Sequence, residues 1–215
     1  MNIFVDLDGT LIDIKSRHYF VYCECVKKFR GQPLAIELYW RMKRDDEKWH
    51  EILKKSSITE ENEGVFLKEF IKLVEDPDVL AQDTLFGDSI DTLQNLSKTH
   101  QLFLLSLRRD DTALRNQVAS LGIDGYFMGI LSGHSDTKAG SLEKKADVVK
   151  SAGLSGQRLL LIGDTEADIV AAQSLGAPCI AVTTGIRSPE ILATYRPDKI
   201  VSAISEVLSL SIIDG

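Results

Sequence analysis

From residue 87 onward, short apolar runs alternate with segments whose apolar residues recur at helical spacing. A first, mainly apolar strand is expected at residues 2–5, and later strands of this kind are expected at 102–106, 126–131, 159–164, 179–185 and 199–201. Continuously apolar strands that alternate with amphipathic helices are typical of a parallel sheet covered by helices on both faces. The pattern therefore predicts an α/β fold with a doubly wound, Rossmann-like parallel sheet.

Residues 15–84 interrupt this alternation directly after the first strand. Between about 16 and 74, aromatic and apolar residues recur at helical spacing, as at Phe66, Phe70 and Leu73, and no run has the character of a strand. We expect three or four helices here. The chain then divides into an α/β core of residues 1–14 and 85–215 and an inserted helical cap of residues 15–84.

Composition and charge narrow the class of protein. Of the 215 residues, 44% are hydrophobic and 27% are charged, and the formal net charge of -7 argues against a nucleic-acid partner. The N-terminus lacks the basic residues of a secretory signal, and no stretch approaches the ~20 apolar residues of a membrane-spanning helix. The three cysteines fit a reducing compartment. We expect a cytoplasmic monomer or homodimer with no membrane or nucleic-acid partner.

Several polar side chains follow the predicted strands. Asp6 and Asp8 come at the end of the first run, Ser106 ends the second, Asp164 ends a later one, and Asp168 lies one helical turn further on. Ligands of parallel sheets bind beyond the carboxyl ends of the strands, so these side chains should share one edge. Converging carboxylates repel each other and raise their own pKa values. A divalent cation removes that repulsion, and a set of carboxylate oxygens suits Mg²⁺.

The order of these residues resembles that of the haloacid dehalogenase superfamily. The DLDGT signature at residues 6–10, the serine at the end of the next strand, a region rich in lysine and the GDTEAD string at residues 163–168 appear in the superfamily's order. The resemblance covers about 2–14 and 85–205, and the intervening stretch lies where the superfamily's first type of cap is inserted. The phosphoglycolate-phosphatase-like branch offers the nearest general analogy.

The resemblance implies a role for each of these residues. Asp6 would be the nucleophile that attacks phosphorus and forms an aspartyl-phosphate. Asp8 would protonate the leaving oxygen and then deprotonate the hydrolytic water. Ser106 would hold a phosphoryl oxygen. The metal ligands would be Asp6, the main-chain carbonyl of Asp8, and Asp164, with Asp168 orienting either the water shell of the metal or the lysine. The dehalogenating branch lacks an acid at the position of Asp8, so its presence indicates phosphate esters or anhydrides.

Three lysines are candidates for the superfamily's conserved cation beside the nucleophile. Lys138, Lys144 and Lys145 all lie in the appropriate region. The Lys-Ala-Asp-Val-Val string that begins at Lys145 resembles a form common in the superfamily. Lys138 has the better spacing to Asp164, but the prolines of the corresponding form are missing. We favour Lys145 by a small margin and keep Lys138 as the second candidate.

Basic and aromatic residues of the predicted cap are candidates for substrate contacts. They comprise Arg17, His18 and the YWRMKR string at residues 39–44. We expect at most two of the basic residues to face the site, and Trp40 and Trp49 to pack in the interior. Arg108 and Arg109 follow Ser106, where contact with a phosphate and an ordinary charged loop both stay open.

Together these residues predict a Mg²⁺-dependent phosphohydrolase acting on a small phosphorylated metabolite. A phosphomutase of the β-phosphoglucomutase type would share every core residue and stays open as an alternative. A phospho-ligand-binding protein without catalysis is a third possibility. Such a protein would have no physical use for Asp8, which contributes proton transfer rather than affinity.

Overall fold

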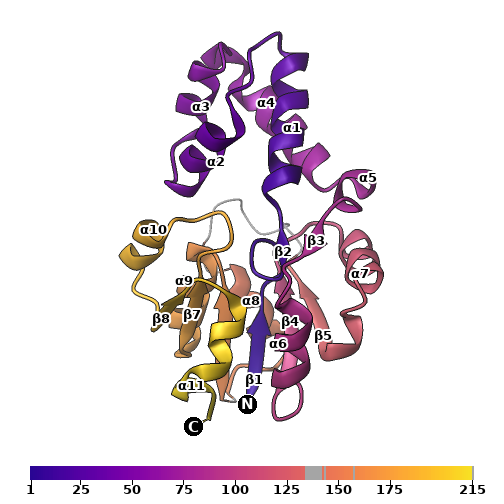
Figure 1. Ribbon diagram of the computed structural model, residues 1–215, viewed down its shortest axis with the longest axis vertical. Helices are drawn as coiled ribbons and strands as arrows, with labels where there is room; N and C mark the ends of the chain where they lie inside the picture. Colours follow the sequence, from indigo (N-terminus) through magenta and orange to yellow (C-terminus); the bar gives the residue numbers. More distant parts are fainter. Residues whose placement is uncertain (134–141, 143, 157, 215) are drawn as a thin grey trace.

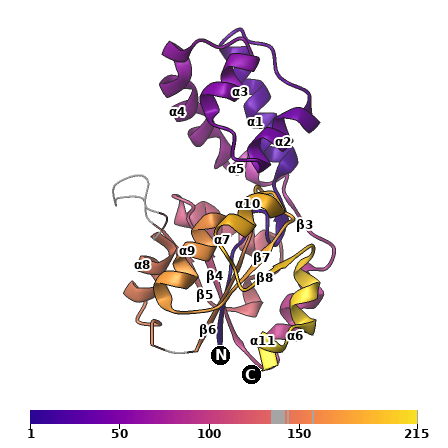
Figure 2. The same ribbon diagram turned by 90° about the vertical axis from the view of Figure 1, so that its left-hand side faces the viewer.

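The computed structural model describes residues 1–133, 142, 144–156 and 158–214 (Figure 1). Lys138, the second candidate lysine, lies outside the described residues. The described part of the chain forms a parallel sheet with helices on both faces. A separate group of helices lies beyond one end of the strands (Figures 1 and 2). Within these ranges, no helix has the length and apolar character needed to cross a bilayer.

The six strands of the central sheet are parallel and follow the order β5-β4-β1-β6-β7-β8. They are β1 (Asn2–Val5), β4 (Gln101–Ser106), β5 (Phe127–Ser132), β6 (Leu159–Gly163), β7 (Cys179–Val182) and β8 (Lys199–Val201). β1 lies between β4 and β6, so Val5 pairs with Leu104 on one side and with Ile162 on the other. The chain thus winds outward from β1 in both directions, and the predicted doubly wound sheet is confirmed.

Alternate residues of the strands face opposite layers of helices. In β1, Ile3 and Val5 belong to one buried apolar cluster and Phe4 to another. The first cluster takes in α6 (Ser89–Leu96), α7 (Asp111–Ser120) and the 3-10 segment η3 (Ile204–Ser209), and the second takes in α8 (Lys144–Ser151), α9 (Glu166–Leu175) and α10 (Pro189–Thr194). Because both faces are covered, the first strand is apolar from Ile3 to Val5.

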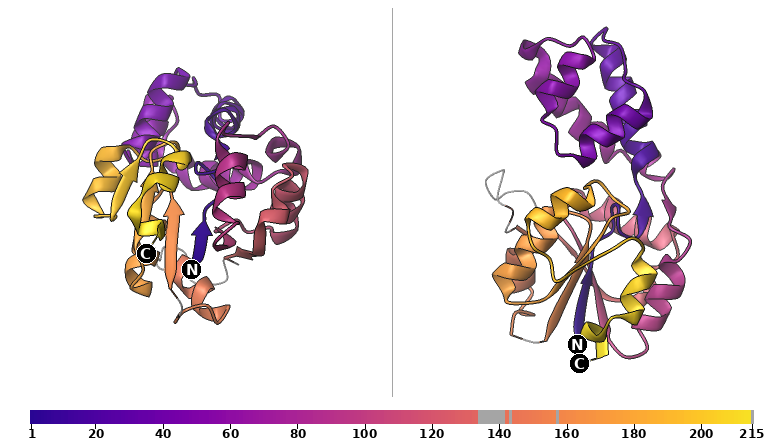
Figure 3. Two further views of the ribbon diagram at one scale, coloured as in Figure 1. Left: turned by 60° about the horizontal axis from the view of Figure 1, so that its bottom comes forward. Right: turned by 60° about the vertical axis from the view of Figure 1, so that its left-hand side comes forward.

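Two short elements complete the α/β part of the chain. The 3-10 turn η2 (Asp124–Tyr126) leads into β5, and the one-turn helix α11 (Ser211–Asp214) follows η3. The N- and C-termini lie side by side at the end of the sheet away from the separate helices (Figure 3). The opposite end, where β1 finishes, is therefore the end that faces those helices.

The separate helices lie beyond the carboxyl ends of the strands (Figures 1 and 3). They are α1 (Lys15–Lys28), α2 (Ile36–Arg44), α3 (Trp49–Lys55), η1 (Glu60–Asn62), α4 (Glu63–Val74) and α5 (Pro77–Leu80). Aromatic rings hold them together: Tyr22 and Tyr39 stack with their centroids 4.2 Å apart, and Trp49 meets Phe70 edge-on at 4.9 Å. Trp40 is also buried in this interior, so the packing role expected for both tryptophans is confirmed.

A short antiparallel ladder joins the two segments that lead into and out of these helices. β2 (Ile12–Asp13) pairs with β3 (Thr84–Leu85), with Ile12 opposite Leu85. The sequence pattern did not predict this ladder, because strands of two residues leave no periodicity to read. The ladder holds the beginning and the end of the helical group close together.

Candidate active site

The predicted site residues meet at the carboxyl ends of three neighbouring strands. Asp6 follows β1, Ser106 ends β4 and Asp164 follows β6. Lys145, in the first turn of α8, reaches the same edge. These four side chains line one cavity of about 270 Å³, which is also lined by residues of the separate helices. The topology therefore brings together residues that are far apart in the sequence.

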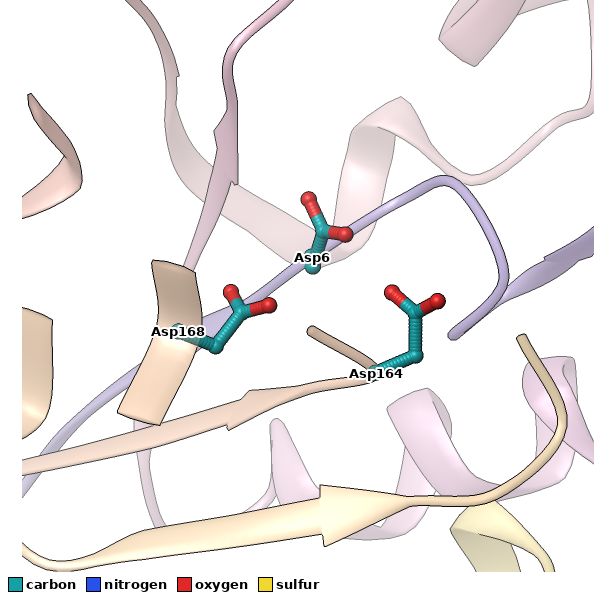
Figure 4. Close-up of side chains that lie close together, drawn as sticks. All are labelled: Asp6, Asp164 and Asp168. Carbon is teal, nitrogen blue, oxygen red and sulfur yellow. The ribbon is translucent and has the colours of Figure 1, made fainter. Parts of the chain in front are cut away.

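Asp6, Asp164 and Asp168 form a buried acidic cluster (Figure 4). One carboxylate oxygen from each residue lies within 4.8 Å of the others. Burial raises the pKa of Asp6 to about 7; the Lys145 ammonium acts to lower it, and the carboxylate of Asp168 acts to raise it. Burial, followed by the charges of Asp6 and Asp168, also raises the pKa of Asp164. These directions show that the cluster is short of positive charge.

The cluster has the features that a divalent cation needs. Oδ2 of Asp164 accepts the N–H of Ile186 at 2.7 Å, whereas its buried Oδ1 has no hydrogen-bond partner within the described residues. A buried carboxylate oxygen without a partner is costly, and a bound cation would satisfy it. The oxygens of Asp6 and Asp164 therefore fit a hard ion such as Mg²⁺.

Two glycines allow the backbone to approach Asp164 closely. A Cβ atom at Gly185 would lie 1.9 Å from Oδ2 of Asp164, and one at Gly9 would lie 2.5 Å from the same oxygen. Gly9 also has a φ of +76°, a conformation that residues with a side chain rarely adopt. The glycine of the DLDGT signature thus both makes the turn and leaves room for the carboxylate of Asp164.

Lys145 lies between two carboxylates of the cluster. Its Nζ is 2.7 Å from Oδ1 of Asp6 and 2.5 Å from Oδ1 of Asp168. Burial alone would lower the pKa of Lys145, but the carboxylates of Asp168 and Asp6 outweigh it and raise the pKa above its ordinary value. Oδ2 of Asp168 accepts hydrogen bonds from Oγ1 of Thr165 at 2.7 Å and from its N–H at 3.2 Å. Both oxygens of Asp168 are thus engaged, and this residue fixes the lysine against Asp6.

Asp8 is held by two arginines. Nε and Nη2 of Arg108 donate to the two carboxylate oxygens of Asp8, each at 2.7 Å, and Nη2 of Arg17 donates to Oδ1. Burial alone would raise the pKa of Asp8, but the guanidinium groups of Arg17 and Arg108 outweigh it and hold the pKa well below its usual range. The carboxylate of Asp8 is therefore ionised in this arrangement.

A second carboxylate and an amide extend this network. Arg17 and Arg108 are both buried. Nη1 of Arg17 lies 3.3 Å from Oδ2 of Asp83, and Nη2 of Arg108 lies 3.8 Å from the same oxygen. Nε2 of Gln117 donates to the same oxygen at 2.8 Å, and its Oε1 accepts from Nη1 of Arg108. Sequence reasoning named both arginines without placing them in the site. The sequence signal that could have placed Arg108 in the site is its position two residues after the end of β4.

Ser106 lines the cavity, whereas Arg109 is exposed and is not among the lining residues. Ser106 is buried, and its Oγ accepts the N–H of Arg108 at 3.3 Å. The N–H of Arg109 donates to Oε2 of Glu75 at 3.1 Å, and Glu75 lines the cavity from the end of α4. Of the two arginines after Ser106, Arg108 thus enters the site through its side chain and Arg109 contacts the helical group through its backbone.

The basic and aromatic candidates of residues 15–84 differ in their surroundings. Arg41 is exposed, and Nζ of Lys43 lies 4.3 Å from the centroid of the Trp49 ring. Arg17 and His18 line the cavity. Tyr39 and Trp40 are buried in the interior of the helical group. Arg44 contacts the α/β part of the chain, as described next. The expectation that few of these side chains face the site is therefore met.

The turn after α2 rests on the loop after β7. Nη1 of Arg44 donates to the carbonyl oxygens of Thr183 at 3.0 Å and of Gly185 at 2.6 Å. Arg187 from the same loop forms a bidentate pair with Glu166, with distances of 2.7 and 2.8 Å, and its Nη1 donates to the carbonyl oxygen of Lys43 at 3.2 Å. These contacts tie the helical group to the loop that holds Asp164.

The chain is similar in sequence to known hydrolases. A family model of haloacid dehalogenase-like hydrolases matches residues 1–176. The chain is 33% identical over 131 residues to a phosphoglycolate phosphatase of Photorhabdus laumondii, a match that covers 58% of this chain and 54% of that protein. The chain thus spans about half the length of this relative. A candidate pyrophosphatase, PpaX, of Caldanaerobacter subterraneus is 29% identical, and the match covers 97% of this chain and 93% of that protein.

Solved structures show the same fold at low sequence identity. A haloacid dehalogenase-like family protein from Streptococcus pneumoniae superposes with a TM-score of 0.77 at 22% identity, covering 97% of this chain and 96% of that one. A predicted phosphoglycolate phosphatase from Haemophilus somnus gives a TM-score of 0.73 at 21% identity, covering 96% of each chain. The family match over residues 1–176 agrees with this fold, and the chain belongs to the haloacid dehalogenase-like hydrolases.

Proposed function

We propose that this protein is a Mg²⁺-dependent phosphohydrolase that removes the phosphate of a small phosphorylated metabolite through an aspartyl-phosphate. The position of Asp6 carries the proposal: it is a buried carboxylate at the end of the central strand, 2.7 Å from the ammonium of Lys145 and beside Asp164. The activities named for two relatives, against phosphoglycolate and pyrophosphate, support a phosphate ester or anhydride as the substrate.

The residues of the cluster suit the attack on phosphorus. Asp6 is the nucleophile, and the transferred group becomes an acyl phosphate on its carboxylate. Lys145 offsets the negative charge of the nucleophile and of the phosphoryl oxygens, while the hydroxyl of Ser106 donates to one of those oxygens. Mg²⁺ bound by Asp6, Asp164 and the main-chain carbonyl of Asp8 would neutralise phosphoryl charge. Asp168 contributes by holding the lysine in place.

Asp8 has the position of a general acid and base. It would protonate the leaving oxygen and then take a proton from the water that hydrolyses the acyl phosphate. Its ion pairs with Arg17 and Arg108 keep it ionised, which is the form that the second step requires. For the first step, those hydrogen bonds have to pass to another group.

We assign the helices of residues 15–84 to a cap that closes over the cavity. Residues of α1 and α4 supply part of its lining, and Arg44 rests on the loop after β7. A closed cap would exclude bulk water from the acyl phosphate and would select the leaving group. The three free cysteines support a reducing, cytoplasmic setting.

The decisive experiment is phosphate release from a panel of phosphorylated metabolites and p-nitrophenyl phosphate, with Mg²⁺ and with EDTA. The Asp6→Asn variant is the control, because it keeps the shape of the side chain and removes the nucleophile. Release that needs Mg²⁺ and disappears in the variant is the expected result. Release that persists in Asp6→Asn would contradict the aspartyl-phosphate.

A further inference from the structure

Two guanidinium groups from different parts of the chain converge on one carboxylate that lines the cavity. Arg17 belongs to the first turn of α1, and Arg108 to the loop after β4. Both donate to Oδ1 of Asp8, and Arg108 also donates to Oδ2. The planar fork of arginine matches carboxylates and phosphates, and hydrogen bonds between charged groups are the strong ones. Asp8 therefore shows what kind of group this pair of arginines binds.

The same wall of the cavity carries buried polar atoms that lack partners. Nε of Arg17 and Nδ1 of His18 are both buried, and neither has a hydrogen-bond partner within the described residues. Arg17 is 5% exposed, so water does not readily compensate its free N–H. A network that served packing alone would be expected to satisfy its buried donors. The unused N–H of Arg17 leaves its guanidinium with donor capacity beyond its ion pairs with Asp8 and Asp83.

The arginine pair lies directly beside the place expected for the transferred phosphate. The N–H of Arg108 donates to Oγ of Ser106 at 3.3 Å, and Asp8 is two residues from Asp6. The whole cavity measures about 270 Å³, and the carboxylate of Glu75 lines it from α4. A cavity of this size suits a small molecule, in which a second negative group would lie close to the phosphate.

We propose that Arg17 and Arg108 bind a second anionic group of the substrate, a carboxylate or a phosphate, next to the phosphate that is transferred. The inference rests on the proposed phosphohydrolase activity and specifies its substrate class. The substrate anion takes the hydrogen bonds that the two arginines now give to Asp8, which leaves Asp8 free to face the leaving oxygen. Asp83 and Gln117 hold the arginines in place during this exchange.

Three substrates separate the sources of the second charge. 2-Phosphoglycolate carries a carboxylate, pyrophosphate carries a second phosphate, and 2-hydroxyethyl phosphate replaces the carboxylate of the first by a neutral CH₂OH group. The first and third share an alcohol leaving oxygen. A hydrogen-bonded charge of this kind corresponds to a preference of about 10- to 100-fold in kcat/KM. We expect the wild-type protein to prefer at least one of the two anionic substrates by this factor.

Variants of the arginines test whether they cause the preference. Arg17→Gln and Arg108→Gln remove the charge, and Arg17→Lys keeps the charge but loses the fork. The matched control is Arg115→Gln, an exposed arginine of α7 that pairs with Asp111 at 2.6 Å, away from the cavity. The glutamine variants should lower kcat/KM more for the anionic substrate than for 2-hydroxyethyl phosphate, so that most of the preference is lost even if both rates fall. Arg17→Lys should keep part of the preference, and the control should keep all of it.

Each outcome decides between the two proposals. Hydrolysis of all three substrates by the wild-type protein with preferences within about threefold would overturn the anion site and leave the phosphohydrolase standing. Equal losses on charged and neutral substrates in the arginine variants would show a structural role and also overturn it. No Mg²⁺-dependent release from any substrate would overturn the phosphohydrolase itself. Because the wild-type preference needs no variant, an arginine variant that fails to fold does not prevent the test.

Discussion

Replacement of Gly185 by alanine should disturb the acidic cluster without altering any of its carboxylates. The new Cβ would lie 1.9 Å from Oδ2 and 2.4 Å from Cγ of Asp164, so the carboxylate or the loop has to move by about 1 Å or more. That movement breaks the hydrogen bond of 2.7 Å from the N–H of Ile186 to Asp164. A hydrogen bond to a charged group contributes about 1.5–3 kcal/mol, and overpacking costs about 1–3 kcal/mol. We expect the free energy of unfolding to fall by roughly 3–5 kcal/mol.

The same displacement should weaken Mg²⁺ binding. Loss of a group that orients a metal ligand typically lowers affinity by about 10- to 100-fold. Calorimetric titration with Mg²⁺ measures the affinity, and urea unfolding in EDTA measures the stability. Gly87→Ala is the matched control, since a Cβ at Gly87 meets no atom within 4 Å. An unchanged urea midpoint would refute the close approach of Gly185 to Asp164, and a lowered midpoint with unchanged Mg²⁺ affinity would refute the assignment of Asp164 as a metal ligand.

Three further changes test other parts of the structure. Lys145→Met leaves two buried carboxylates without their ammonium, so the free energy of unfolding in EDTA should fall by about 3–5 kcal/mol; an unchanged urea midpoint would count against the buried ion pairs. The pKa of His18 is lowered from 6.5 to about 3, first by burial and then by the charge of Arg17. Between these two pH values the folded protein binds fewer protons than the unfolded chain, so the folded state loses stability as the pH falls from about 6.5 to about 3. His18→Phe should therefore lose less stability than the wild type between about pH 7 and about pH 5, and parallel unfolding curves would disprove this. Arg44→Gln removes two hydrogen bonds to the loop after β7, and we expect KM to rise by up to about tenfold with an unchanged circular dichroism spectrum; an unaltered KM would show that this contact does not help to close the cap.

The sheet and its functional edge could be predicted from the sequence because their signals are local. Residues 3–5 are apolar, since both faces of β1 are buried, and Asp6 directly follows. Asp164 follows the later apolar run of β6 in the same way. In a parallel sheet the ends of such strands meet at one edge whatever the order of the strands, so the cluster follows from the pattern without knowledge of the topology.

The partners of Asp8 and the choice of lysine depend on distant parts of the chain. Arg17 begins the first helix of the insertion and Arg108 follows β4, and their meeting depends on how the helical group sits on the sheet. No sequence period encodes that placement. Lys145 is identified by its burial against Asp168, which requires the packing of α8 on α9. Basic residues of this kind look like ordinary surface charges until the tertiary structure is known.

The ladder between β2 and β3 makes the helical insertion an exchangeable module. Ile12 and Leu85 sit opposite each other, so the chain leaves the sheet and returns to it at almost the same point. Loop-closure entropy rises by only about 0.6 kcal/mol for each doubling of the length between two fixed ends. Shorter or longer insertions can therefore be accommodated between the same two strands while the acidic cluster beneath them stays intact. Replacement of this one segment would exchange Arg17 and the other groups that it places over the cavity, while Asp6, Asp164 and Lys145 would stay at the ends of the strands.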